Sequence, residues 1–135
     1  MTDGPASLPG AAELRRRRGS AAHHGGVAAE EAVARHYEGR GLAVLRRRWR
    51  GRWGEVDLIA RDGATVVFVE VKKARSLEAA ALRLRPAQVG RLCAAAQEFL
   101  DGEPRGGLTP MRFDLALVDG LGRVEVVENA FGQDW

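Results

Sequence analysis

The sequence predicts an α/β fold in which helices flank a central β-sheet, with elements in the order α-β-β-β-α-β-β. Two observations support this prediction. Segments whose apolar residues recur at helical spacing stand before and after a block of strand-like sequence. The strands of the clearest hairpin are apolar on both faces, and a sheet of that kind is normally covered on both sides.

Local signals give the elements their bounds. Gly39 and Gly41 end the first helix. Asp62-Gly63 is a favoured hairpin turn, and Pro86 lies in the first turn of the second helix. In order, the expected elements are a helix at 25–39, a short strand at 42–45 that leads into an arginine-rich segment, strands at 56–60 and 65–71, a helix at 85–100, and strands at 112–118 and 123–127.

Length and composition indicate one soluble domain with a basic tail. The 135 residues suffice for a single core, and residues 1–24 predict a mobile basic tail before a domain at 25–135. No apolar run reaches the ~20 residues of a membrane span, and the start of the chain does not resemble a secretory signal. Cys93 is the single cysteine, so no intramolecular disulfide is expected, and a cytoplasmic location fits.

Charge is unevenly distributed along the chain. The formal net charge is +3, yet residues 40–52 hold six arginines and no acid, while residues 114–135 hold five acids and one arginine. This asymmetry predicts a polyanion-binding side, although a charge run alone is usually a solvated face. Trp49 and Trp53 lie among the arginines, and either can stack on an exposed base or belong to the core. The arginines expected to contact phosphates are Arg46, Arg47, Arg48, Arg50 and Arg52.

A group of charged residues falls on one face of the predicted hairpin. If Asp62 and Gly63 are the central residues of the turn, position 57 lies opposite 68 and position 55 opposite 70. Side chains alternate faces along a strand and share a face across it. Two of the carboxylates are then diagonal neighbours, about 7–8 Å apart at the backbone. The charged side chains on this face are Glu55, Asp57, Glu70 and Lys72.

Three acids beside one lysine are costly on a covered sheet, because they repel one another and lose hydration. A divalent cation relieves that cost. Oxygen ligands without cysteine or convergent histidine favour Mg²⁺ or Mn²⁺ over zinc. The alternative is a structural ion pair at the end of the sheet, with Glu55 and Glu70 beside Lys72 or an arginine.

Five segments carry a resemblance to a known family. They are Gly26-Val27-Ala28-Ala29-Glu30, Gly54-Glu55-Val56-Asp57-Leu58-Ile59-Ala60, Phe68-Val69-Glu70-Val71-Lys72, Arg112-Phe113-Asp114 and Asn129-Ala130-Phe131. In these the chain resembles the YraN family of bacterial proteins, within the PD-(D/E)XK nuclease superfamily, and its core is similar to archaeal Holliday-junction resolvases. The resemblance covers residues 25–131. It implies a restriction-endonuclease-like fold, with a mixed central β-sheet flanked by helices.

The resemblance also implies roles at the metal site. Asp57 and Glu70 would be ligands of Mg²⁺ or Mn²⁺, and Lys72 would position or activate the attacking water. Glu30 would be the additional helical acid of the superfamily, whereas Glu31 would face elsewhere.

Two further residues are candidates beside these. Glu55 is either another ligand or an acid outside the ligand set. Gln88 lies where related nucleases carry a polar helix residue, although the YraN family tends to have lysine there.

These observations favour an enzyme, a Mg²⁺-dependent endonuclease that hydrolyses phosphodiester bonds. DNA is the expected substrate, and the sequence leaves RNA open. No base-reading motif is present, so we expect selectivity for branched or flapped structures. The alternative is a nucleic-acid-binding protein that keeps the nuclease fold with little or no catalysis. A third hypothesis is an interaction module whose arginine segment binds an acidic protein. Resolvase-like relatives pair as dimers, so a homodimer is a further expectation, and no membrane partner is expected.

Overall fold

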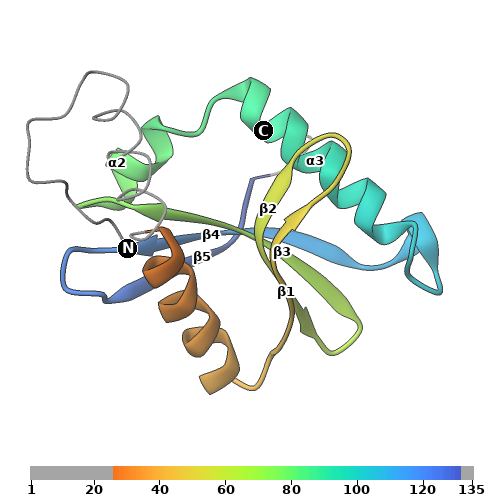
Figure 1. Ribbon diagram of the computed structural model, residues 1–135, viewed down its shortest axis with the longest axis horizontal. Helices are drawn as coiled ribbons and strands as arrows, with labels where there is room; N and C mark the ends of the chain where they lie inside the picture. Colours follow the sequence, from red (N-terminus) through yellow and green to blue (C-terminus); the bar gives the residue numbers. More distant parts are fainter. Residues whose placement is uncertain (1–25, 132–135) are drawn as a thin grey trace, which may run out of the picture.

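The computed structural model describes residues 26–131, which form a mixed five-stranded sheet with helices on both sides (Figure 1). The sheet order is β1-β2-β3-β4-β5, and β3 and β4 are parallel while the other neighbouring pairs are antiparallel. The expected basic tail at 1–24 lies outside the described residues. In order, the elements are a first helix at 26–39, β1 (Ala43–Arg50), β2 (Glu55–Asp62), β3 (Thr65–Lys73), α2 (Leu77–Leu82), α3 (Pro86–Leu100), the 3₁₀ helix η1 (Gly106–Leu108), β4 (Met111–Val118) and β5 (Val124–Phe131).

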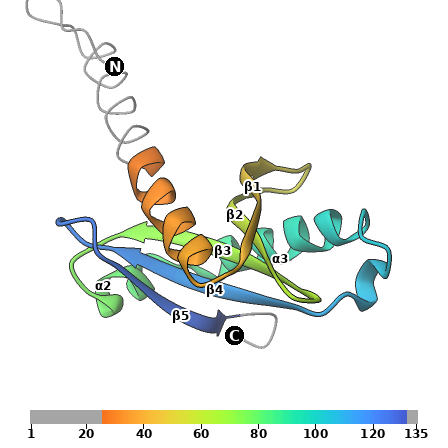
Figure 2. The ribbon, with the colours of Figure 1, turned by 90° about the horizontal axis from the view of Figure 1, so that it is seen from below.

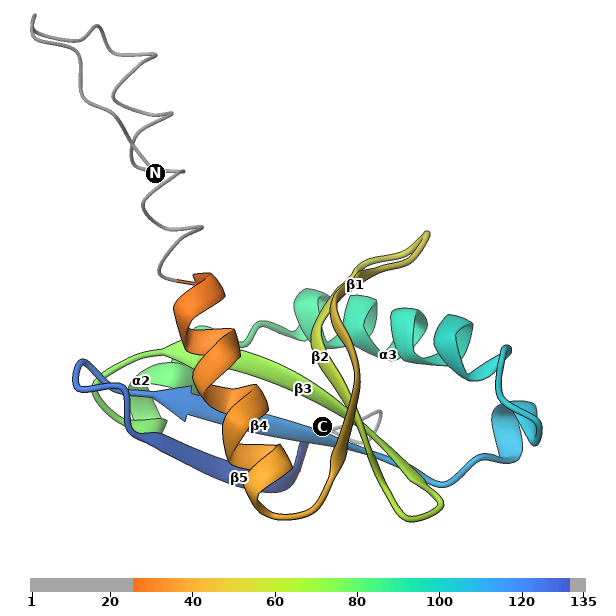
Figure 3. The same ribbon diagram turned by 60° about the horizontal axis from the view of Figure 1, so that its bottom comes forward.

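The sheet is covered on both faces, as its two-sided apolar pattern predicts. The first helix buries Val33 and Tyr37 against one face, together with Leu58 and other side chains of the sheet. On the opposite face α3 packs over Ile59 and Phe68. Figure 2 shows the first helix on one side of the sheet, and Figure 3 shows α3 running along the other. Among the described residues, no helix combines the length and apolar character that crossing a membrane requires.

The register of the β2–β3 hairpin differs by two residues from the sequence prediction. Asp62 pairs with Thr65, so Gly63 and Ala64 are the central residues of the turn. Gly63 has a φ of 60°, the positive value that tight hairpin turns require at their first central position. Because side chains alternate with a period of two, this shift leaves every residue on its predicted face. It brings position 57 opposite 70, where the prediction had them diagonal.

Three other elements depart from the prediction. The strand expected at 42–45 continues through the arginine segment to Arg50, because Arg46, Arg47 and Trp49 pair with β2. Pairing with a neighbouring strand outweighs the modest intrinsic preferences of these side chains. α2 was not expected, although Ser76 caps it by accepting the Ala79 N–H. β5 runs to residue 131 instead of ending at 127, because Phe131 pairs with β4.

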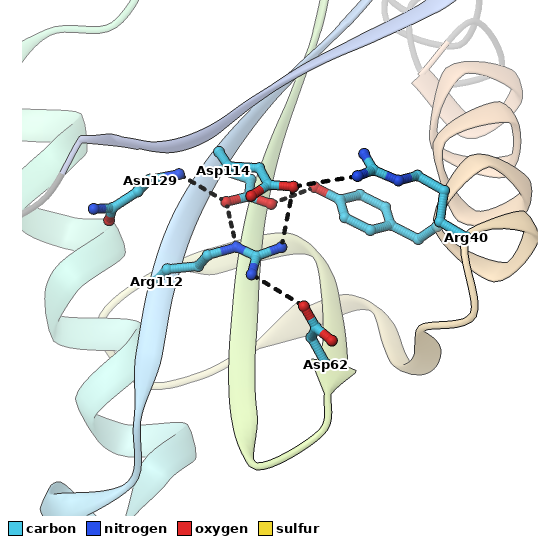
Figure 4. Close-up of polar contacts among 7 residues, drawn as sticks. Arg40, Asp62, Arg112, Asp114 and Asn129 are labelled. Carbon is cyan, nitrogen blue, oxygen red and sulfur yellow. Dashed lines mark hydrogen bonds and ion pairs between the residues drawn. The ribbon is translucent and has the colours of Figure 1, made fainter.

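A fully buried carboxylate joins the first helix to β4 and β5. Asp114 accepts hydrogen bonds from the Tyr37 hydroxyl at 2.7 Å, from Arg112 Nε at 3.0 Å and from the Asn129 backbone N–H at 3.0 Å (Figure 4). Burial, and then the negative charge of Asp114, raise the pKa of Tyr37, which keeps the hydroxyl a donor. Arg112 also contacts Asp62 at the hairpin turn. The Arg112-Phe113-Asp114 segment thus anchors the first helix to the sheet.

Candidate active site at the open end of β2 and β3

The predicted carboxylates meet where β2 and β3 separate. The paired residues of the two strands run from the turn to Leu58 and Val69. One residue further, Asp57 Oδ2 accepts the backbone N–H of Val71 at 2.9 Å. The side chains of Asp57 and Glu70 are hydrogen-bonded to each other. The structure therefore brings these two carboxylates together, as the face argument predicts.

Lys72 and Gln88 complete the surroundings of Glu70. The Glu70 side chain is 6% exposed, and its Oε2 lies 3.0 Å from Lys72 Nζ. The same oxygen accepts a hydrogen bond from Gln88 Nε2 at 2.7 Å. Lys72 comes from the end of β3 and Gln88 from the first turns of α3. Gln88, which joined the prediction through the resemblance alone, thus contacts a predicted metal ligand.

Burial makes the carboxylate pair reluctant to hold two negative charges. Loss of hydration and then the charge of Asp57 raise the pKa of Glu70 to about 7. Burial also raises the pKa of Asp57, although the Val71 N–H and Lys72 oppose that shift. Near neutral pH the two carboxylates are therefore unlike two free acids, because ionisation of one opposes ionisation of the other. One bound cation would satisfy both charges.

Glu30 brings a third acid from the first helix. It is 8% exposed, burial raises its pKa, and Asp57 and Glu55 add to that shift. Arg48 Nε lies 2.7 Å from Glu30 Oε1 and lowers the pKa in opposition. Arg48 has a φ of 51°, uncommon for a residue with a side chain. Glu31 contacts Arg47 instead, so it faces away from the pair, as expected.

Glu55 stands at the margin of this group. It is exposed on β2, and Oε2 lies 3.3 Å from Arg50. Its charge raises the pKa of Asp57 and of Glu30, which shows that it lies near both acids. Glu55 therefore lies beside the carboxylate pair, in contact with Arg50, and its part in binding a metal stays a prediction.

The arginine segment forms much of β1, an edge strand of the sheet. Four of the five predicted phosphate contacts are exposed, and Arg48 is half-buried beside Glu30. The two tryptophans have different surroundings. Trp49 packs edge-on against Phe99 of α3 at 5.5 Å between ring centroids, whereas Trp53 is 60% exposed. The structure thus assigns Trp49 to the core and leaves Trp53 on the surface.

The donor set fits a hard divalent cation. Asp57 and Glu70 offer oxygen atoms, and the nearest nitrogen donors, on Lys72 and Gln88, are cationic or amide groups that metals seldom use. Within residues 26–131 no group of three or more His, Cys, Asp and Glu side chains converges closely enough to hold a metal. A cation at Asp57 and Glu70 would complete its shell with water and substrate oxygens, a mode that suits Mg²⁺.

Residues of α3 that the sequence did not indicate hold the β1–β2 loop. The Arg52 backbone N–H donates to Glu98 Oε1 at 2.7 Å, and the Gly51 N–H donates to the Gly54 carbonyl at 2.9 Å. A Cβ at Gly51 would lie 2.6 Å from the Trp49 ring and from Glu98 Oε1. Gly51 and Gly54 could have indicated that the backbone here packs closely against another segment. The sequence could not identify that partner, Glu98, because it lies more than 40 positions away on α3.

Comparison with known proteins gives the family. Residues 29–118 match the family described as uncharacterised protein family UPF0102. A UPF0102 protein of Ruegeria pomeroyi is 65% identical over 105 residues, which cover 78% of this chain and 85% of that protein. One from Cereibacter sphaeroides is 64% identical over 103 residues, 76% of this chain and 88% of that protein. One from Dinoroseobacter shibae is 51% identical over 102 residues, 76% of each chain.

These names state no activity, so the relation to the nuclease superfamily and to Holliday-junction resolvases stays a prediction. The YraN-like part of the resemblance is confirmed by the family match and by the identities over most of each chain. The chain belongs to the UPF0102 family.

Proposed function

We propose that this protein is a Mg²⁺- or Mn²⁺-dependent endonuclease that hydrolyses phosphodiester bonds in DNA, with selectivity for branched or flapped structures. The observation that carries the proposal is a carboxylate pair, the buried Glu70 and the half-buried Asp57, beside Lys72 at the open end of two strands. The pair is destabilising by itself, and a site retained at such a cost is a candidate for function.

The arrangement has little use in a protein that merely binds nucleic acid. Acids that face a polyanion weaken its binding, and burial adds a further cost to each of them. Phosphodiester hydrolysis gives the same groups a purpose. A cation bound by Asp57 and Glu70 would polarise the phosphate and lower the pKa of an attacking water.

The chain's own residues supply the remaining parts. Lys72, half-buried within 3.0 Å of Glu70, is the positive group that would orient the water and offset charge developing on the phosphate. Gln88 fixes the Glu70 carboxylate by a hydrogen bond from α3. Glu30 adds negative charge near Asp57 and holds Arg48 close to the site.

The exposed side chains of β1 suit the substrate. Arg46, Arg47, Arg50 and Arg52 are exposed on the strand and loop that lead directly to Glu55. Arg47 and Arg50 are paired with Glu31 and Glu55, and phosphates would compete for them. Binding of this kind weakens steeply as salt rises.

A nucleic-acid-binding protein with little or no catalysis is the second candidate. It is favoured by the Glu70–Lys72 ion pair and by the missing third ligand among residues 26–131. An ion pair of this kind satisfies part of the buried charge without any metal.

The deciding experiment incubates the protein with branched, flapped, linear and single-stranded DNA in Mg²⁺ or Mn²⁺ and compares Asp57→Asn with the wild type. Asp101→Asn, at an exposed helix end, is the matched control for loss of one aspartate charge. We expect cleavage by the wild type and by the control, and a loss of orders of magnitude in Asp57→Asn with binding retained. Equal cleavage by Asp57→Asn would exclude this site, and binding without cleavage on every substrate would establish the second candidate.

A further inference from the structure

An exposed tryptophan marks the loop between β1 and β2. Trp53 is 60% exposed, the largest side chain among the exposed apolar residues of the described chain. Its loop projects away from the body of the sheet, beyond the strands that carry the carboxylates (Figures 2 and 3). A large indole held in solvent gains free energy from any flat apolar surface that covers it.

Hydrogen bonds and packing hold the loop that carries this ring in place. Two backbone N–H groups of the loop are bonded, Gly51 to the Gly54 carbonyl and Arg52 to Glu98 of α3. Beneath the loop the Trp49 ring packs on Phe99, and the Gly51 backbone approaches that ring too closely to accept a Cβ. Trp53 therefore belongs to a loop docked on α3, which reduces the entropy lost when a ligand binds it.

The charges around Trp53 favour a nucleotide over an apolar protein surface. Arg52 precedes it in the loop and is exposed, and the Arg50 side chain is 79% exposed. The backbone of Arg91 on α3 lies against Gly54, and Arg91 is exposed, so a third arginine starts close to this loop. An aromatic face among guanidinium groups can stack a base while the cations contact phosphates. A base inside a duplex has both faces covered, so the ring can use only an unpaired one.

We propose that Trp53 stacks on an unpaired base and thereby selects DNA that has a single-stranded segment next to the bond to be cut. This rests on the proposed endonuclease function and names its substrate class. Trp53 precedes Asp57 by four residues, at most about 13 Å of extended chain. At roughly 3.4 Å per stacked nucleotide, the cut falls within about four nucleotides of the stacked base.

The test measures binding in EDTA, so that cleavage does not enter. Fluorescence polarisation compares a single strand, a flapped duplex and a blunt duplex for wild type, Trp53→Ala and Trp53→Phe. Leu121→Ala is the control, because Leu121 is 80% exposed on a different loop. Trp53→Ala is expected to bind the single strand and the flap roughly 5- to 150-fold more weakly, with Trp53→Phe within about threefold of wild type. Affinity for the blunt duplex, which depends on the arginines, is expected to stay within about twofold.

A second arm locates the base. An abasic nucleotide is moved one position at a time along the flap, and one position next to the duplex is expected to weaken wild-type binding as much as Trp53→Ala does. At that position, combining the abasic site with Trp53→Ala should weaken binding no more than either change alone, because both remove the same stacking contact.

The outcomes separate this inference from the proposed function. A single-strand preference that survives in Trp53→Ala overturns the stacking role, whatever the wild type cleaves. If Trp53→Ala loses the preference for single-stranded DNA and the wild type cleaves no DNA, the stacking role is supported and the proposed endonuclease function is overturned. Wild-type protein that binds none of the three DNAs overturns both.

Discussion

Replacing Glu70 with glutamine separates two effects of the carboxylate pair, its role in the proposed reaction and the stability that the fold loses by holding it. Glutamine has the shape of the protonated acid, carries no charge, and can still donate a hydrogen bond to Asp57. It also keeps an oxygen that can accept from Lys72 and Gln88, the two donors that Glu70 Oε2 receives in the structure. We therefore expect Glu70→Gln to fold, to lose activity, and to be more stable than the wild type above neutral pH.

The magnitude follows from the pKa of Glu70, raised from 4.5 to about 7 by burial and by Asp57. Below pH 4.5 the carboxyl is protonated in both the folded and the unfolded chain, so its contribution does not vary with pH. Between 4.5 and about 7 the folded chain keeps a proton that the unfolded chain has released, and stability falls as pH rises. At roughly 1.4 kcal/mol per pKa unit the total loss is at most about 3 kcal/mol.

Urea unfolding of the chelator-treated protein at pH 5 to 8 measures this loss. Glu125→Gln, on the exposed side of β5, controls for removal of one glutamate charge. The wild type and the control should lose stability over this range while Glu70→Gln stays nearly level. Above pH 7, Mg²⁺ at a hundred times its Kd should raise the free energy of unfolding of the wild type by about 3 kcal/mol, and that of Glu70→Gln by much less. The reasoning is refuted if Glu70→Gln and the wild type show the same pH dependence.

Three further predictions concern the fold and the charged surface. Asp114→Ala removes the acceptor of three donors, of which the Tyr37 hydroxyl is buried, and should lower the free energy of unfolding in urea by about 3–5 kcal/mol. Tyr37→Phe should lower it by about 1.5–3 kcal/mol, and a loss under about 1 kcal/mol for Asp114→Ala would show that the anchor is dispensable. Gly51→Ala forces a Cβ to within 2.6 Å of the Trp49 ring and should lower the melting temperature, while an unchanged value would mean that the loop relaxes freely. The logarithm of the duplex affinity should fall linearly with the logarithm of salt concentration, with a slope smaller by about one in Arg46→Ala; an identical slope would remove Arg46 from the interface.

Much of the fold could be predicted because strong local signals determined it. The hairpin strands alternate between two apolar faces, and both faces proved to be covered. The same alternation placed Asp57 and Glu70 together although the turn was misplaced by one residue, since the pairing register then shifts by two and an even shift preserves the face. Gly63 explains the shift, because its positive φ suits the first central position of the turn and the prediction had it second.

What could not be predicted depends on contacts between distant segments. β1 extends through the arginines because β2 offers a paired backbone, which the local composition does not reveal. α2 is short, and its signal was an ordinary Ser cap before alanines. Glu30 reached the predicted site through the family resemblance, and its closeness to Asp57 follows from how the first helix crosses the sheet.

Two aspartates of the sheet, Asp57 and Asp114, show why we propose a function for one carboxylate site and not for the other. Asp114 accepts hydrogen bonds from donors on three elements, so its charge is compensated within the fold. Asp57 instead has one backbone donor and lies beside Glu70, whose pKa burial and then the charge of Asp57 raise to about 7. Charge that the fold leaves partly uncompensated is typical of a site shaped for a ligand. Arg112 and Tyr37 compensate the charge of Asp114 by donating hydrogen bonds to it. A bound cation would compensate the charges of Asp57 and Glu70 in the same way, and for this reason metal binding is the property to measure first.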